Sequence, residues 1–386
     1  MSHGLSDRLA HWTSALVRIP SVNPVHAGPK AGVPGERAIA LALAGWLEDF
    51  GARVEVCDVV DGRPNVYGLV PGRSDRLVVL DVHTDTVSVE HMVEEPFDGR
   101  IEDGCVWGRG ALDTKANLGV ILALLERWAI AGLRPEPNLL VVGSISEEGG
   151  GMLGAIAFRE WGEARGLCPQ QIVVSEPTGC VPIYGHKGGA GYEVVVAGEA
   201  AHSSRPELGR SAIVAAARAV LALQDEHDRL QTEEPLTEVG VGSLNVGLIS
   251  GGTAGNIVPD LCTFTVGRRV CPGEDAEAVA AALQALIEGA VAPCTATFTP
   301  IGTGVPSAGF YQPPDTAVVR TLAEATGSAP AVAPYGTNAL RYVGFGEQLV
   351  VFGPGSIDDA HKAIECVAIS ELERCAAAFE AWLRPA

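Results

Sequence analysis

The order in which strands and helices follow one another changes partway along the chain, and this change limits the folds available to it. At first, β-branched runs such as Leu77–Val82 alternate with segments whose apolar residues recur at helical spacing, which predicts an α/β sheet with helices on both faces. Residues 183–296 have a different expected order, namely strand, helix, two strands, helix and strand, which suits a four-stranded sheet of its own. Because the α/β pattern resumes afterwards, we expect one domain, residues 1–182 and 297–386, interrupted by an inserted domain, residues 183–296. The expected elements of the insertion include strands at Tyr192–Val196, Val239–Leu248 and Ile257–Val266 and helices at Ser211–Leu223 and Glu274–Glu288.

Composition excludes several classes of protein. The chain has 386 residues, 47% hydrophobic and 19% charged, a balance typical of globular proteins rather than disordered ones. Its formal net charge of −20 argues against a nucleic-acid partner, because such binding needs a basic surface. The most apolar stretch, Ser211 to Leu223, is interrupted by Arg218 and too short to span a bilayer, so no membrane partner is expected. The N-terminus lacks a secretory pattern, and nine scattered cysteines form no C-x-x-C pair, so we expect a cytoplasmic protein with reduced thiols.

Two histidines and several acids follow predicted strands or lie in the glycine-rich segments after them. In open α/β sheets, ligands bind in the crevice beyond the carboxyl ends of the strands. Imidazole and carboxylate groups together form a ligand set suited to Zn²⁺, Co²⁺ or Mn²⁺. The pattern therefore predicts a metal site at this edge of the sheet. The residues concerned are His83, Asp85, Asp113, Glu147, Glu148, Glu176 and His361.

Each of these residues, taken alone, has an ordinary structural explanation. A histidine after a strand is more often hydrogen-bonded than a ligand, and adjacent acids such as Glu147 and Glu148 favour the first turn of a helix. Their joint occurrence in this order favours the metal site. No G-x-S-x-G, G-x-x-x-x-G-K-[ST] or H-E-x-x-H pattern occurs, so competing catalytic schemes have little support.

The segments around these residues resemble the co-catalytic zinc metallopeptidase family of acetylornithine deacetylase, succinyl-diaminopimelate desuccinylase and glutamate carboxypeptidase. The resemblance covers nearly the whole chain. It implies a zinc-peptidase-like α/β catalytic domain with a mixed sheet, and an inserted, ferredoxin-like α+β lid of four strands. The segments that carry it are VRIPSVNP, DVHTDTV, WGRGALDTKANLG, SISEEGGG, VSEPTG, GEAAHSSRPELGRSAI, GGTAGNIVPD, RRVCPGE and GPGSIDDAHK.

Carried over residue by residue, the resemblance implies two divalent metal ions. Zinc is the expected metal, with cobalt or manganese as alternatives. His83, Asp113 and Glu176 would hold one ion. Asp113 would bridge to a second ion, held also by Glu148 and His361.

The resemblance also implies roles for two acids that are not ligands. Asp85 would accept the other ring N–H of His83 with its carboxylate and so fix the tautomer of the imidazole. Glu147 would be the general base, taking a proton from a water whose pKa the two ions lower and passing it to the leaving amine. The peptide bond between Asp113 and Thr114 is often cis in this family.

Further expectations concern the insertion and substrate binding. His202 resembles a lid histidine that stabilises the tetrahedral oxyanion, in dimeric members from the partner subunit; a hydrogen-bonded surface role is the alternative. Asn256 and Arg269 match positions that grip the α-carboxylate of the substrate, for which a planar guanidinium is suited. Arg269 is preferred to the adjacent Arg268 because of its distance from Pro272–Gly273.

One loop departs from the family pattern. Gly336 and Thr337 resemble a substrate-lining loop, and relatives commonly carry an acid at the next position, which is Asn338 here. We expect Asn338 to line the substrate site, and the missing acid weakens the case for ornithine itself.

The resemblance therefore implies a cytoplasmic amidohydrolase that removes an acyl group from the α-nitrogen of an L-amino acid. Acetyl is the acyl group we expect. A homodimer assembled through the lid is expected. Glu176, where aminopeptidase relatives tend to carry aspartate, favours deacylases and carboxypeptidases. The alternatives within the family are a carboxypeptidase, a dipeptidase or an N-succinyl amino acid desuccinylase. A catalytically inactive relative that serves as a binding module is the alternative from a different class.

Overall fold

The computed structural model describes residues 4–149, 151–302 and 304–386, so Gly150 of the SISEEGGG segment lies outside the described residues. The chain divides into two compact units. Unit 1 comprises Met1–Tyr184, Gln312–Ala331 and Thr337–Ala386, and unit 2 comprises Gly185–Tyr311 and Val332–Gly336. Unit 2 extends beyond the expected insertion at its second boundary, and the domain limits themselves stay predictions.

The sheet of unit 1 brings the ends of four parallel strands to one edge. β3, β6, β7 and β17 are neighbours and run parallel, whereas β1 and β2 are antiparallel to what they pair with. Their nearly continuous burial is typical of parallel strands covered on both faces. The strand order is β1 (Arg53–Val60), β2 (Arg63–Val70), β6 (Asn138–Ser144), β3 (Leu77–His83), β7 (Gln171–Val174), β17 (Gln348–Val351) and β8 (Ile183–His186), the last containing the unit boundary.

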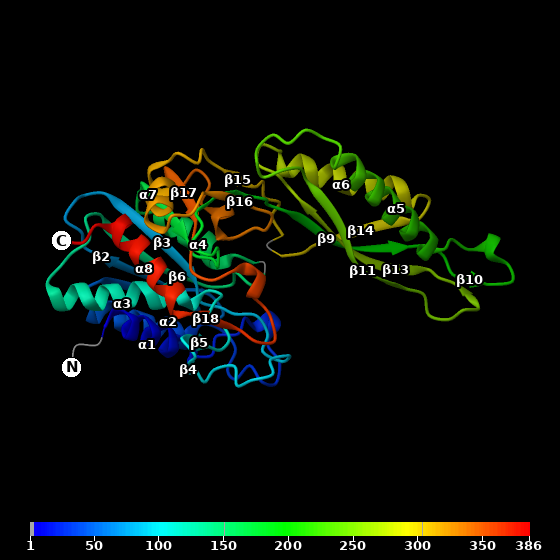
Figure 1. Cartoon of the computed structure of the whole chain (residues 1–386). Coiled ribbons are helices and arrows are strands. Elements are labelled where there is room, and N and C mark those ends of the chain that lie inside the picture. Colours follow the sequence, from blue (N-terminus) through cyan, green and yellow to red (C-terminus); the bar gives the residue numbers. More distant parts are fainter. Residues whose placement is uncertain (1–3, 150, 303) are drawn as a thin grey trace. The chain divides into compact units, whose positions relative to one another are not determined.

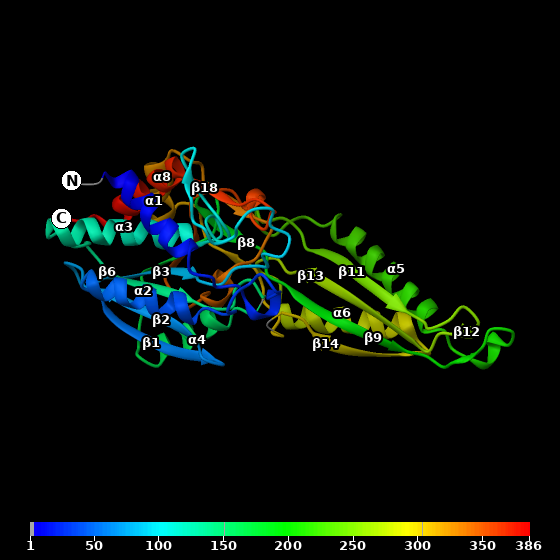
Figure 2. The ribbon, with the colours of Figure 1, turned by 90° about the horizontal axis from the view of Figure 1, so that it is seen from below.

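Helices cover both faces of this sheet, as the sequence predicts (Figures 1 and 2). α2 (Arg37–Asp49) and α4 (Leu153–Glu163) pack on one face. α3 (Lys115–Ala131) and α7 (Ala317–Thr326) pack on the other, and α1 (Leu5–Val17) and α8 (Ile369–Leu383) pack against α3. α3 is buried around most of its circumference because it lies between the sheet and these two outer helices.

Short elements complete the two units. β18 (Cys366–Ala368), β5 (Cys105–Trp107) and β4 (Ile101–Glu102) form a three-stranded antiparallel sheet. β15 (Phe310–Tyr311) pairs with β8 in unit 2, and β16 spans Ala331–Ala333. The 3-10 helices are η1 (Pro24–His26), η2 (Pro206–Leu208, in unit 2), η3 (Asn338–Arg341) and η4 (Ile357–Asp359).

Unit 2 has the expected strand–helix–strand–strand–helix–strand order and the ferredoxin-like arrangement. Its sheet is antiparallel throughout, with the order β11-β13-β9-β14. The two helices pack on the sheet, and the buried side chains between them form a core of its own. The elements are β9 (Ala190–Ala197), α5 (Ala212–Leu230), β11 (Ser243–Gly251), β13 (Leu261–Arg269), α6 (Ala276–Val291) and β14 (Thr295–Pro300).

The single strand expected over Ile257–Val266 is wrong, because the structure has two strands there. β12 (Ile257–Val258) pairs with β10 (Ala201–His202) in a separate two-stranded ribbon, whereas β13 begins at Leu261 in the main sheet. Pro259 lies between them, and a proline cannot donate a ladder hydrogen bond. This break sends His202 and its neighbours out of the main sheet.

Candidate active site

The predicted metal ligands of the parallel strands converge in unit 1. His83 is the last residue of β3, and Glu147, Glu148 and Glu176 follow β6 and β7. His83, Glu147 and Glu176 offer ligand atoms that all lie within 4.8 Å of one another. His83, Asp113 and Glu148 form a second group within the same limit. The residues singled out by their position after strands therefore meet, and each group has the size of a metal site.

Asp113 lies between the two imidazoles. One carboxylate oxygen, Oδ1, is 3.1 Å from His83 Nε2, and the other, Oδ2, is 3.2 Å from His361 Nε2. His361 Nε2 also lies 3.1 Å from the carboxylate of Glu148. The Asp113–Thr114 peptide bond is cis, in agreement with the family resemblance. One carboxylate thus contacts both histidines, as a bridging ligand must.

Three glutamates of this cluster hold protons more tightly than ordinary acids, whereas hydrogen bonds from His361 and His83 lower the pKa of Asp113. Burial raises the pKa of Glu147 to about 8, and the negative charge of Glu148 adds to the effect. Burial, followed by the charge of Asp113, raises the pKa of Glu148 to about 7. Burial and the charge of Glu147 hold the pKa of Glu176 well above its usual value. The acids are packed together with too little positive charge to balance them.

The histidines respond in the opposite sense. Hydrogen bonds to Asp113 and then Glu148 raise the pKa of His361 to about 10. Burial opposes the charged form of His83, but the hydrogen bond with Asp113 and the charge of Glu176 raise its pKa well above normal. The raised pKa of each imidazole shows that the acids favour positive charge at these two positions. A divalent cation would supply the same positive charge, and the nitrogen and oxygen donors fit zinc, cobalt or manganese.

The expected role of the Asp85 carboxylate is wrong. His83 Nδ1 lies 3.0 Å from the main-chain oxygen of Asp85, whereas the carboxylate oxygen is 3.8 Å away. The main-chain carbonyl therefore accepts the ring N–H and fixes the tautomer. The carboxylate accepts the main-chain N–H groups of Glu147 and Glu148, at 3.1 and 3.0 Å, and the amide of Asn23 at 2.8 Å. Asp85 consequently orients the loop that carries two acids of the site.

A second buried carboxylate, Glu36, supports the same loop and was not singled out by the sequence. Its Oε1 accepts the N–H of Ser146 at 3.2 Å, and both its oxygens accept from Arg63 at 2.6 Å. Glu36 and Asp85 together hold the amides of three consecutive residues. An acid in front of a helix is an ordinary N-terminal residue, so only the VRIPSVNP segment, which contains Asn23, carried a signal for this support.

In unit 2, His202 and Asn256 lie together. His202 pairs with Ile257 across the β10–β12 ribbon, and the main-chain oxygen of Asn256 accepts the N–H of Ser203 at 3.0 Å. Both residues are exposed. The N–H of Ser204 donates to His202 Nδ1 at 3.1 Å, so the neutral ring carries its proton on Nε2. His202 is thus prepared to donate a hydrogen bond.

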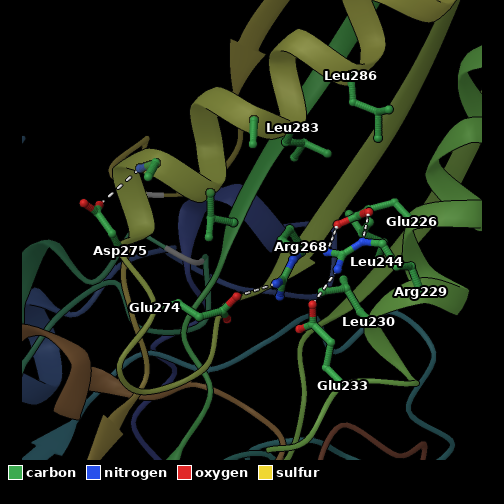
Figure 3. Close-up of a pocket in the computed structure, with 13 residues that line it drawn as sticks. Glu226, Arg229, Leu230, Glu233, Leu244, Arg268, Glu274, Asp275, Leu283 and Leu286 are labelled. Carbon is green, nitrogen blue, oxygen red and sulfur yellow. Dashed lines mark hydrogen bonds and ion pairs between the residues drawn. The ribbon is translucent and has the colours of Figure 1, made fainter. Parts of the chain in front are cut away.

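The two adjacent arginines point to opposite faces of β13. Arg268 is buried and ion-paired with Glu274 at 2.6 Å, beside a cavity of about 540 Å³ between α5 and α6 (Figure 3). Arg269 is exposed on the other face and, in the described part of the chain, has no ion-pair partner. The preference for Arg269 as the residue available to a ligand agrees with this alternation.

The β10–β12 ribbon lies at one end of unit 2 (Figures 1 and 2). β13 begins at Leu261, next to the ribbon, and ends at Arg269. At about 3.3 Å per residue, those eight steps separate the two ends by about 26 Å. A single copy of unit 2 therefore does not bring Asn256 and Arg269 together, and the prediction that both grip one carboxylate would need them to come from two copies.

The loop with Gly336, Thr337 and Asn338 has a structural role that the sequence did not indicate. Thr337 is buried, and its hydroxyl accepts the N–H of Ala339 at the start of η3. Asn338 is also buried, and its amide donates to Asp81 at 3.0 Å and to Ser144 at 3.1 Å. The Asn338 side chain is engaged in the interior of unit 1, so we no longer assign it to substrate recognition. Gly336 is partly exposed.

Comparisons with known proteins agree with this architecture. Residues 184–293 match the family model of the peptidase dimerisation domain. The chain is 34% identical over 388 residues to acetylornithine deacetylase of Myxococcus xanthus, covering 97% of each chain. Among solved structures it resembles the aminopeptidase PepT of Bacillus cereus, with a TM-score of 0.76, 23% identity, and coverage of 98% of this chain and 99% of that one. It also resembles an M20 family metallo-carboxypeptidase of Sulfolobus solfataricus, with a TM-score of 0.78, 17% identity, and coverage of 97% and 98%. The two structural likenesses concern the fold.

Proposed function

The chain belongs to the M20 family of metallopeptidases and deacetylases and is a hydrolase of amide bonds, and we propose that it removes an acyl group, with acetyl as the preferred candidate, from an N-acyl L-amino acid. The observation that carries the proposal is the convergence of two histidines and four acids, four of these six residues at the ends of parallel strands, in a chain similar over 97% of its length to a deacetylase.

We assign two divalent ions to this cluster, with zinc as the preferred metal for both. His83, Asp113 and Glu176 would hold one ion, and Asp113, Glu148 and His361 would hold the other. When bound, the two ions would polarise the amide carbonyl and lower the pKa of the attacking water. The raised pKa values of the acids support this proposal, because they show where positive charge is lacking.

Glu147 is our proposed general base. In the described part of the chain, no hydrogen-bond partner holds its carboxylate, whereas Asp85 fixes its main chain. Glu147 would take the proton of water as the new C–O bond forms. It would then deliver that proton to the amine nitrogen as the C–N bond breaks, which yields the free amino acid and the carboxylic acid.

The remaining recognition groups come from unit 2. The exposed guanidinium of Arg269 would bind the α-carboxylate of the substrate. His202 Nε2–H would donate to the oxyanion, and Asn256 beside it would contact the same substrate. Because the ribbon and Arg269 are at opposite ends of unit 2, we assign the ribbon residues to the active site of a second copy.

A homodimer follows from this assignment, and the edge of the unit 2 sheet supports it. β11 is an edge strand whose residues are largely exposed, and Leu248 and Ile249 are apolar side chains on it. An exposed, apolar edge strand is a ready surface for pairing with another chain. We propose that two copies associate through unit 2 along this edge.

A carboxypeptidase or dipeptidase is the second candidate. The observation in its favour is Arg269, because an exposed guanidinium binds the C-terminal carboxylate of a peptide as readily as that of an acyl amino acid. The two reactions share the same attack on an amide carbonyl. Only the substrate distinguishes them.

We place the enzyme in the cytoplasm because its nine cysteines are all free thiols. No helix among the described residues is long and apolar enough to cross a membrane.

The test is amine release from a panel of N-acetyl amino acids, N-succinyl amino acids and dipeptides. The protein is first stripped with a chelator and then restored with Zn²⁺ or Co²⁺. We expect metal-dependent release from N-acetyl amino acids, and the panel then ranks their side chains. Release from dipeptides alone would select the peptidase. No release from any member, with two ions bound per chain, would contradict the proposed substrate class.

A further inference from the structure

Two charged side chains far apart in the sequence form an ion pair in the interior of unit 1. Arg109 precedes Asp113 in the WGRGALDTK segment, and Glu365 follows His361 by four residues. The exposed fractions of the two residues are 1% and 2%. Nη1 of Arg109 donates to Oε2 of Glu365. Neither residue is among the proposed metal ligands.

The second carboxylate oxygen of Glu365 holds the main chain around Asp113. Oε1 accepts three N–H groups, from Gly110 at 3.0 Å, Leu112 at 3.0 Å and Asp113 at 3.2 Å. Three amides that converge on one anionic oxygen fix the course of this segment. Glu365 therefore fixes the position of the main chain from which the Asp113 side chain extends.

Arg109 connects the same segment to the loop of His361. Its Nη2 donates to the main-chain oxygen of Lys362 at 3.1 Å and to that of Ser88 at 3.2 Å. Lys362 is the residue after His361. The pairing of β5 with β18 and the hydrogen bond from Gly108 N–H to the Glu365 carbonyl, at 3.0 Å, continue this connection.

Stability alone does not account for this pair. Replacing a buried ion pair by well-packed apolar residues is often neutral or stabilising, because removing two charges from water is costly. The Arg109 Nε is also buried without a partner among the described residues, which adds to the cost. The pair lies where two segments, about 250 residues apart in sequence, must deliver ligands to one ion.

We propose that Arg109 and Glu365 are positioning residues that hold Asp113 and His361 at the spacing required by the second metal ion, and so set the affinity for that ion. This inference rests on the proposed two-metal function. The pair acts through the main chain of the ligands, and it does not contact the ligand atoms in the described structure.

The experiment is a calorimetric titration of Zn²⁺ into the metal-free full-length protein, for wild type, Glu365→Gln and Arg109→Lys. Glutamine keeps an oxygen for the three amides but turns an NH₂ group towards Arg109. Lysine keeps the charge but cannot reach two carbonyls with a planar fork. We expect the second ion to bind about 10- to 100-fold more weakly in both variants, the range found for residues that orient metal ligands. The melting temperature of each metal-free protein is measured alongside.

The matched control is Glu274→Gln, which removes the partner of Arg268 in unit 2 and touches no proposed ligand. It should lower the melting temperature and leave both zinc affinities unchanged. Glu365→Gln that loses melting temperature like the control, yet binds the second ion as tightly as wild type, would overturn the inference. If Glu365→Gln does not fold, an unchanged second affinity in Arg109→Lys overturns it. Wild type that binds fewer than two ions would instead refute the two-metal function on which the inference depends.

Discussion

At the scale of single residues, the acids around the site differ in what they accept. The carboxylates of Asp85 and Glu36 accept main-chain N–H groups and so hold the loop that carries Glu147 and Glu148. The carboxylate of Glu147 has no such bond among the described residues, although it lies in one of the two ligand groups. This difference supports our proposal that Glu147 moves a proton, whereas Asp85 and Glu36 hold its loop in place.

Glu147→Gln tests this division. We expect kcat to fall by a factor of about 10²–10⁴, because an amide cannot take up the proton of water. Two zinc ions should still bind, since the proposed ligands are intact, and this is measured by elemental analysis after dialysis. Turnover close to wild type would reject Glu147 as the base, and the loss of one ion would make it a ligand instead.

The positions of the ligands could be predicted, but the partners of the supporting acids could not. His83, Glu148 and Glu176 each follow a parallel strand, and strand ends meet by topology alone. The partners of Asp85, Glu36 and Glu365 depend on which loop packs over each side chain. Such tertiary contacts leave no trace in spacing or periodicity, so the sequence misassigned Asp85 and did not single out the other two.

At the scale of elements, β8 carries a buried histidine unrelated to the metal cluster. His186 lies in this strand, packed edge-on against the ring of Phe310, with centroids 4.6 Å apart. Burial, together with the nearby charge of Arg269, lowers its pKa to about 4. The folded protein therefore keeps this ring neutral at pH values where the unfolded chain would protonate it.

This shift predicts a pH dependence of stability. The unfolded chain binds a proton at His186 below a pH of about 6.5, whereas the folded protein does so only below a pH of about 4. The free energy of unfolding therefore falls as the pH drops from about 6.5 to about 4, and this contribution does not change further at lower pH. The loss amounts to about 3 kcal/mol, from 1.36 kcal/mol per pKa unit. Melting temperatures of wild type and His186→Gln between pH 4 and 7 measure it. The variant should have the flatter slope. Equal slopes for wild type and His186→Gln would contradict the prediction.

The order of the long elements was predictable, because each has a clear period and a boundary residue. The insertion was found for the same reason. Strands of two or three residues, such as β10 and β15, are too short for any periodicity. The division of Ile257–Val266 at Pro259 was missed because apolar residues continue on both sides of the proline.

At the scale of the whole molecule, the proposed roles of Arg269 and His202 predict that two copies complete one site. Arg269 and His202 are too far apart along β13 to meet one small substrate, so each chain would use its own Arg269 and the partner's ribbon. A monomer in sedimentation that keeps full activity would refute this arrangement.

Mixed dimers provide the sharper test. His202→Ala and Glu147→Gln should each be nearly inactive, with His202→Ala down by about 10²–10³ through loss of an oxyanion donor. Co-expression of the two variants should restore about a quarter of wild-type activity, because half of the dimers are mixed and one site in each is intact. If His202 acted within its own chain, every mixed site would keep one substitution and no activity would return.

The surface of association can be tested in the same assay. Leu248 on β11 and Leu236 on a loop of unit 2 are both 71% exposed, so they form a matched pair. Leu248→Glu, added to both variants, should abolish the recovery, because like charges would meet across a symmetric interface. Leu236→Glu should leave the recovery unchanged.

The order of the segments in unit 1 has a consequence for synthesis on the ribosome. β17, which pairs with β7 in the sheet, is made after the whole of unit 2, and so are His361 and Glu365. At a translation rate of 5–20 residues per second, the edge of β7 that pairs with β17 stays unpaired for on the order of ten to thirty seconds. During this interval β7, already paired with β3, leaves its other edge unpaired, and chaperones or neighbouring chains can bind there. A product truncated before β17 would keep all three proposed ligands of the first ion but lack a strand of the sheet, so we expect an aggregation-prone fragment rather than a weak enzyme.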